Sequence, residues 1–270
     1  MTVAERLSRE QVFHDQQARV RSITYERCPE QLRLDDDAYL DHETWIRPAF
    51  AELEPLRGRS LLDFGCGHGM ASVVLARRGA KVTAFDLSSG YLQEAHHRAA
   101  ANHATVAFVQ ADGARLPFGD ASFDRIWGNA ALHHLDIDLA GVELRRVLRP
   151  HGVAVFCEPW GGNWLLNCAR RHLPYPGKQR TADERPLNAD DLSRLRRVFP
   201  TLRIQGVQLL SMARRLWRNG RLPTTLDWCD HMLLDRVPVL QRFCRYVILT
   251  LPKIGPVTVQ YFPEGRRKCS

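Results

Sequence analysis

An acid followed by three alternating glycines is the first group of residues whose spacing suggests chemistry. These residues are Asp63, Gly65, Gly67 and Gly69, with Cys66 inside the turn. Glycines let the backbone turn tightly and approach a ligand closely, and a helix that begins behind them directs free N–H groups toward that ligand. A dinucleotide-binding loop requires a glycine at position 70, where this chain has Met70. The spacing therefore indicates a cofactor-binding turn of a different kind.

Two more acids follow short apolar runs farther along the chain. Asp86 lies 23 residues after Asp63, and Asp112 follows the apolar run at residues 105–109. Because ligands of open α/β sheets bind outside the carboxyl ends of the strands, both acids are expected beside the same ligand. A carboxylate at that edge can accept charge-assisted hydrogen bonds from hydroxyl or amino groups.

Three residues are candidates for proton transfer, namely His133, His134 and Glu158. They lie near the carboxyl ends of the fourth and fifth predicted strands. Histidine suits general-base catalysis because it ordinarily titrates near neutral pH. In the alternative interpretation, one histidine packs against the sheet and the other caps the next helix, while Glu158 anchors a cationic or hydroxyl group. The sequence leaves both interpretations open.

From Ser60 onward, short apolar runs alternate with helical patterns. Strands are expected at residues 60–64, 81–85, 105–109, 122–127, 152–157, 201–209 and 245–251. Helices are expected at residues 68–78, 88–101, 136–148 and 190–198, with a helical stretch at 211–243. Strands that alternate with helices of about 10 to 15 residues predict crossover connections and a parallel sheet.

The run Leu61–Gly69 closely resembles motif I of the class I S-adenosylmethionine-dependent methyltransferases, of the small-molecule type found in ubiquinone and menaquinone biosynthesis. The resemblance implies that the glycine turn contacts the methionine portion of S-adenosylmethionine and that Asp63 lies near its amino group. It also implies that Asp86 holds the ribose hydroxyls and that Asp112 accepts the adenine amine. The cofactor-binding residues expected on this basis are Asp63, Gly65, Cys66, Gly67, Gly69, Asp86, Leu87, Asp112, Gly113, Asn129 and Ala130.

Together, the pattern and the resemblance predict an α/β fold with a Rossmann-like, seven-stranded, mostly parallel sheet, helices on both faces and a helical lid. Residues 1–57 are expected to form a helical segment that covers part of the cofactor and substrate site. Residues 58–160 are expected to form the S-adenosylmethionine-binding core. Residues 161–270 are expected to supply the rest of the sheet and an inserted substrate-covering lid.

The composition is that of an ordinary globular protein, with 270 residues, 44% hydrophobic and 25% charged. The net charge of +8 comes mainly from arginine. It reflects either a bias of the genome or attraction to a phosphate, a carboxylate or an anionic membrane surface. Seven cysteines without a CxxC pair favour a reducing compartment, so we expect a cytoplasmic protein that needs no metal. No transmembrane segment or leader is expected.

The predicted function is methyl transfer from S-adenosylmethionine to a small organic molecule, anionic or apolar, in natural-product or lipid biosynthesis. The acceptor atom, oxygen, nitrogen or carbon, stays open. A prenyl diphosphate, a quinone or a phospholipid is an alternative acceptor. Nucleic acid is disfavoured because Asn129, Ala130 and Ala131 replace the Asn/Asp-Pro-Pro-aromatic signature of amino-methylating enzymes. A dehydrogenase or a non-catalytic nucleotide-binding protein is the alternative from another class. The sequence leaves open peripheral membrane contact and the choice between monomer and homodimer.

Overall fold

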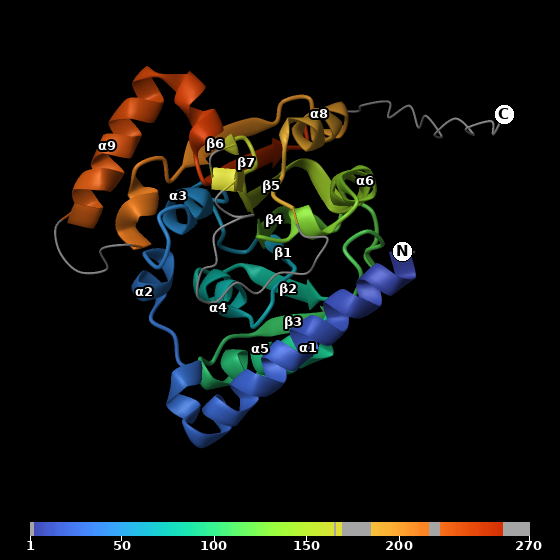
Figure 1. Cartoon of the computed structure of the whole chain (residues 1–270). Helices are drawn as coiled ribbons and strands as arrows, with labels where there is room; N and C mark the ends of the chain where they lie inside the picture. The colour runs from blue at the N-terminus through green and yellow to red at the C-terminus, as the bar shows by residue number, and fades with distance from the viewer. Residues whose placement is uncertain (1–2, 165, 169–184, 216–221, 256–270) are drawn as a thin grey trace.

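The computed structural model describes residues 3–164, 166–168, 185–215 and 222–255 (Figure 1). Within these residues, seven strands form one sheet in the order β3-β2-β1-β4-β5-β7-β6. The strands are β1 (Ser60–Phe64), β2 (Lys81–Asp86), β3 (Val106–Gln110), β4 (Phe123–Asn129), β5 (Leu148–Pro159), β6 (Arg203–Val207) and β7 (Tyr246–Pro252). Strand β7 is antiparallel to both neighbours, and the other pairings are parallel. The predicted seven-stranded, mostly parallel sheet is confirmed.

The predicted strand positions agree with the observed ones to within two residues, except at the start of β5. Strand β5 begins at Leu148, ahead of the predicted start at residue 152, because Leu148 pairs with Phe123 across a register shift. Strand β6 covers Arg203–Val207 and is shorter than the predicted 201–209. Neither difference changes the order of the strands or the edge at which they end.

Helices cover both faces of the sheet, as predicted. They include α4 (Met70–Arg77), α5 (Ser89–Ala101), α6 (Ile137–Val147) and α8 (Ala189–Val198). Leu61 of β1 packs in a core with α4, whereas Leu62 and Phe64 of the same strand pack in a second core with α6 and α8. Because side chains alternate across a strand, apolar residues at successive positions of β1 fill both cores.

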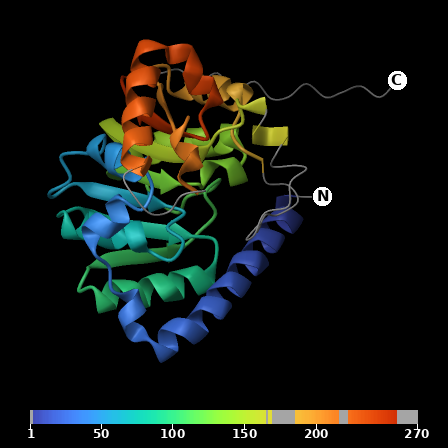
Figure 2. The same ribbon diagram turned by 60° about the vertical axis from the view of Figure 1, so that its left-hand side comes forward.

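The N-terminal region contains a long helix, α1 (Val3–Arg27), followed by η1 (Pro29–Leu32), α2 (Asp36–Leu40) and α3 (Ile46–Ala51). The sequence predicted a helical segment at residues 1–57 that covers part of the site, without the bounds of its helices. Helix α1 lies along α5 (Figure 2). The carboxylate of Asp15 accepts hydrogen bonds from the Ser88 hydroxyl and from the backbone N–H of Gly90, at 2.5 and 3.0 Å. A Cβ added to Gly90 would lie 2.9 Å from the Cβ of Ala18, so the glycine allows the helices to approach.

The predicted helical stretch at 211–243 is divided into η3 (Ser211–Arg215), α9 (Leu222–Arg236) and η4 (Pro238–Phe243). Asp230 of α9 accepts hydrogen bonds from the backbone N–H groups of Leu209, Leu210 and Ser211, which ties the helix to the chain after β6. Parts of the predicted 161–270 region, at residues 165, 169–184, 216–221 and 256–270, lie outside the described residues. Across the residues that the structure covers, no helix combines the length and the apolar character needed to span a membrane.

Gly128, near the end of β4, provides a test of the core beneath the carboxyl edge. A Cβ added there would lie 2.2 Å from Cε1 of the fully buried Phe156, whose ring packs against Phe64 at 5.4 Å. We expect Gly128→Ala to lower the free energy of unfolding by about 1 to 3 kcal/mol, the usual cost of overpacking a core. Urea unfolding measures the loss. Gly119→Ala is the control, because its nearest atom would lie 3.6 Å away; equal stability of the two variants would contradict the expectation.

Candidate functional site

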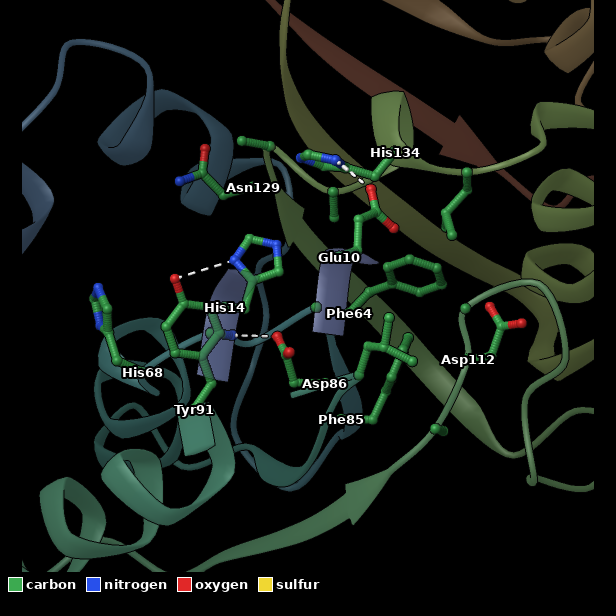
Figure 3. Close-up of a pocket in the computed structure, with 18 residues that line it drawn as sticks. Glu10, His14, Phe64, His68, Phe85, Asp86, Tyr91, Asp112, Asn129 and His134 are labelled. Carbon is green, nitrogen blue, oxygen red and sulfur yellow. Dashed lines mark hydrogen bonds and ion pairs between the residues drawn. The ribbon is translucent and has the colours of Figure 1, made fainter. Parts of the chain in front are cut away.

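A pocket of about 250 Å³ opens at the carboxyl ends of β1, β2, β3 and β4 (Figure 3). The predicted cofactor-binding residues that line it are Gly65, Gly67, Asp86, Leu87, Asp112, Gly113, Asn129 and Ala130. The others, Asp63, Cys66 and Gly69, are not among its lining residues. The structure therefore brings together residues from four separate turns of the chain, as the pattern of strand ends implied.

Asp63 lies behind the glycine turn rather than in the pocket. Its side chain is buried and accepts hydrogen bonds from the hydroxyl and the backbone N–H of Ser72. Helix α4 begins after Gly69, which has no side chain to cap it, so the carboxylate of Asp63 takes over that role from the neighbouring strand. Burial raises the pKa of Asp63 to about 7. Its predicted contact with the amino group of a cofactor stays a prediction.

Gly69 and Cys66 shape the turn without lining the pocket. Gly69 has a φ of +79°, and a Cβ there would lie 2.7 Å from the Cβ of Ala95, so both its conformation and its contact with α5 require glycine. The backbone N–H of Cys66 donates to the carbonyl of Phe85 at 2.8 Å, which fastens the turn to β2. Burial raises the pKa of the Cys66 thiol well above its usual range.

Asp86 is the carboxylate that joins the glycine turn to the pocket. Its side-chain oxygens accept hydrogen bonds from the backbone N–H groups of Gly67 and Ser88, at 2.8 and 2.9 Å. Burial raises the pKa of this carboxyl, while the hydrogen bonds to the backbone oppose the shift. A carboxylate held in this way keeps lone pairs that can accept hydrogen bonds from the hydroxyls of a ligand.

Asp112 and Gly113 form the part of the pocket that follows β3. The carboxylate of Asp112 accepts a hydrogen bond from the backbone N–H of Ala114 at 2.9 Å, which folds the turn. A Cβ at Gly113 would lie 2.7 Å from Phe64 and 2.8 Å from Leu135. Only glycine fits between these side chains, so the backbone itself borders an apolar part of the pocket.

Of the three candidates for proton transfer, only His134 lines the pocket. Glu158 is fully buried; one carboxylate oxygen accepts the backbone N–H groups of Ala131 and Leu132, and the other lies 2.7 Å from Nδ1 of His133. Glu158 and His133 thus support the turn from beneath, and a catalytic role for either stays a prediction. The alternative in which a histidine caps the next helix is wrong, because the side chain of Asp136 accepts the first N–H groups of α6.

Helix α1 contributes two residues to the pocket, Glu10 and His14, which the sequence analysis did not identify. Nδ1 of His134 lies 2.8 Å from a carboxylate oxygen of Glu10, and Nδ1 of His14 lies 3.3 Å from the hydroxyl of Tyr91 (Figure 3). Burial lowers the pKa of His14, although the nearby Asp86 opposes the shift. The spacing of four residues between Glu10 and His14 indicates one helix face, but both are polar, so the pattern has none of the apolar periodicity that identifies a packed face.

His68, inside the glycine turn, carries an unsatisfied nitrogen at the pocket. Among the described residues, its buried Nδ1 has no hydrogen-bond partner. Burial lowers the pKa of His68 to about 4, and the neighbouring Arg98 acts in the same direction. The ring is therefore neutral at physiological pH. A buried polar atom without a partner costs about 1 to 3 kcal/mol of stability.

Residues 62–156 match the family model described as the methyltransferase domain. The chain is 36% identical over 138 residues to the demethylmenaquinone methyltransferase of Clavibacter sepedonicus, covering 51% of this chain and 54% of that protein. It is 42% identical over 107 residues to the malonyl-[acyl-carrier protein] O-methyltransferase of Enterobacter lignolyticus, covering 39% and 41%. The chain thus spans about half, or less, of the length of these curated relatives.

The fold is also similar to that of geranyl diphosphate C-methyltransferase from Streptomyces coelicolor A3(2), solved with Mg²⁺, geranyl diphosphate and S-adenosyl-L-homocysteine. The TM-score is 0.54 at 16% sequence identity, covering 77% of this chain and 78% of that one. This likeness concerns the arrangement of the sheet and its helices.

The buried Asp63 should make the free energy of unfolding decrease as the pH rises toward about 7. Its pKa is about 7 in the folded chain against an ordinary 3.8, so between these values the folded state retains a proton that the unfolded state has lost. The stability that this group contributes is complete at low pH and is lost as the pH rises through about 7. We expect Asp63→Asn, which resembles the protonated form, to gain stability relative to the wild type as the pH rises from about 5 to 7.5.

Urea unfolding at several pH values measures this difference. Asp120→Asn is the control, because that carboxylate is exposed. A stability difference between Asp63→Asn and wild type that does not change with pH would show that Asp63 is ionised throughout.

Proposed function

We propose that this chain is a class I S-adenosylmethionine-dependent methyltransferase that transfers a methyl group from S-adenosylmethionine to a small organic molecule. The observation that carries the proposal is the position of Asp86. Its carboxylate closes the glycine turn through Gly67 and also lines the pocket, so one acid joins the turn to the ligand site.

The pocket suits the parts of S-adenosylmethionine. Asp86 would accept the ribose hydroxyls, and Leu87 would lie against the adenine. Asp112 and the backbone of Gly113 would meet the polar edge of the adenine, beside the apolar ring of Phe64. Gly65 and Gly67 also line the pocket, so the backbone of the glycine turn would border the methionine portion.

When bound, S-adenosylmethionine supplies an electrophilic methyl group on a positively charged sulfur. The work left to the protein is mainly to hold the two reactants in line, which is worth about 7 to 11 kcal/mol of the barrier. Helix α1 contributes by covering the pocket with Glu10 and His14, which shields the reactants from water. Asn129, whose side-chain oxygen accepts a hydrogen bond from Nε1 of Trp45 at 3.1 Å, would border the reactants at the end of β4.

The acceptor in this proposal is a small molecule, anionic or apolar, and the enzyme acts in the cytoplasm in natural-product or lipid biosynthesis. The names of the relatives, a quinone and an acyl-carrier-protein methyltransferase, agree with that range. Among the described residues, no arginine lines the pocket. The support for a prenyl diphosphate or phospholipid acceptor is therefore limited to the basic composition of the sequence. The paired arginines at 196–197, for example, are exposed on α8.

Replacing Asp86 tests the proposal. We expect Asp86→Ala to weaken binding of S-adenosylmethionine by roughly 10-fold to 100-fold, because a hydrogen bond to a charged group contributes about 1.5 to 3 kcal/mol. Calorimetric titration measures the dissociation constant. Asp120→Ala is the matched control, an exposed carboxylate away from the pocket.

The same titration with NAD separates the proposal from the dehydrogenase alternative. Binding of NAD without binding of S-adenosylmethionine by the wild type would overturn the proposed function. An unchanged dissociation constant in Asp86→Ala would overturn the placement of the ribose.

A further inference from the structure

Glu10 and His134 form a pair between elements that are far apart in the chain. Nδ1 of His134, in the turn after β4, lies 2.8 Å from Oε1 of Glu10, which belongs to α1 and precedes it by 124 residues. Glu10 is 7% exposed, whereas the side chain of His134 is 21% exposed and both residues line the pocket. A buried carboxylate thus supports a histidine that faces the ligand site (Figure 3).

The chemistry of the two groups determines which ring nitrogen carries the proton. An ionised carboxylate can only accept hydrogen bonds, so Nδ1 of His134 must donate to Glu10. A neutral imidazole has one proton, and its lone pair then lies on Nε2. Glu10 therefore selects the form of His134 in which Nε2 is the basic atom.

Contacts on both partners hold this geometry. On the side of the sheet, Glu158 of β5 accepts hydrogen bonds from the N–H groups of Ala131 and Leu132 and contacts His133, which fixes the backbone that carries His134. The rings of His133 and His134 lie 4.1 Å apart.

On the side of Glu10, two residues that follow it in α1 fasten this helix to the region of α5. Asp15 binds Ser88 and Gly90, and Arg21 forms an ion pair with Glu94 at 2.9 Å. His14, with its ring 6.2 Å from that of His134, is the other titratable group of α1 at this end of the pocket. The pair is therefore complete only when α1 is docked on α5.

We propose that Glu10 is the positioning residue for His134, and that His134 acts as the general base for an acceptor that must lose a proton. The proposal rests on the proposed methyltransferase function and narrows its substrate class. Phenols, hydroquinones and amines carry such a proton, whereas an ionised carboxylate does not need a base. The acceptor's O–H or N–H bond would break, its proton would move to Nε2, and its electron pair would form the new bond to the methyl carbon. The bond between that carbon and sulfur would break at the same time, with its electron pair left on the sulfur of S-adenosylhomocysteine.

The tautomer of His134 tests the positioning role without a known acceptor. In the full chain labelled with ¹⁵N-histidine, nuclear magnetic resonance at a pH where the ring is neutral should show Nδ1 protonated and Nε2 unprotonated. Glu10→Leu removes the acceptor and should shift His134 toward the opposite tautomer. Glu10→Gln keeps a neutral acceptor and should give an intermediate population. Glu26→Gln, an exposed position on the same helix, is the control and should match the wild type.

The rate of methyl transfer tests the role of His134 as general base. Formation of S-adenosylhomocysteine is followed with two probe acceptors, a naphthohydroquinone and a malonyl thioester carboxylate. We expect the wild type to methylate the hydroquinone, and Glu10→Leu to lower its kcat by about 10-fold or more, the lower range of effects of general-base catalysis. The KM for S-adenosylmethionine should stay within about two-fold, because the cofactor contacts are unchanged.

The outcomes separate the two proposals. An unchanged His134 tautomer in Glu10→Leu, or a wild type that methylates only the carboxylate probe, would overturn this inference and leave the methyltransferase function intact. Failure of the wild-type chain to bind S-adenosylmethionine by calorimetry would overturn the proposed function, whatever the tautomer of His134.

Discussion

Buried carboxylates that satisfy backbone N–H groups hold the carboxyl edge of this sheet together. An unpaired buried N–H group costs about 1 to 3 kcal/mol, and every turn that builds the pocket contains such groups. Three strands end in an acid that meets this need, namely Asp63 in β1, Asp86 in β2 and Glu158 in β5. Their partners are the N–H groups of Ser72, of Gly67 and Ser88, and of Ala131 and Leu132. Without these acids, the glycine turn and the turn that carries His134 would lose their shared geometry.

The same burial gives the pocket its electrostatic character. Burial raises the pKa of Asp63 to about 7 and also raises that of Asp86, while it lowers the pKa of His68 to about 4. Burying these polar groups costs free energy, because each loses hydration that the protein only partly replaces. Of the two acids, only Asp86 lines the pocket, so it is the carboxylate that hydroxyls of a bound ligand could reach, whereas Asp63 acts on the turn behind it.

Helix α1 differs from the other helices in how it is held. Besides the buried Ala18 and Tyr25, it uses polar contacts, with Glu10 at His134, Asp15 at the start of α5 and Arg21 at Glu94. Such contacts are weaker than an apolar core and depend more on geometry.

The sequence by itself determined the sheet, the glycine turn and the acids at the strand ends, because strand periodicity and glycine spacing are local properties of the chain. Only the tertiary structure decided what several of these residues do. Asp63 and Glu158 end predicted strands, yet they face backbone N–H groups rather than the pocket. A helical cover was expected at residues 1–57, but the pocket residues Glu10 and His14 were not identified, because α1 has no single apolar face (Val12, Val20 and Ile23 are exposed) and the partner of Glu10 lies 124 residues away. An acid at a strand end can accept hydrogen bonds from a ligand or from backbone N–H groups of a neighbouring turn. Which of the two it does depends on the turn that packs beside it, and that turn comes from a distant part of the sequence.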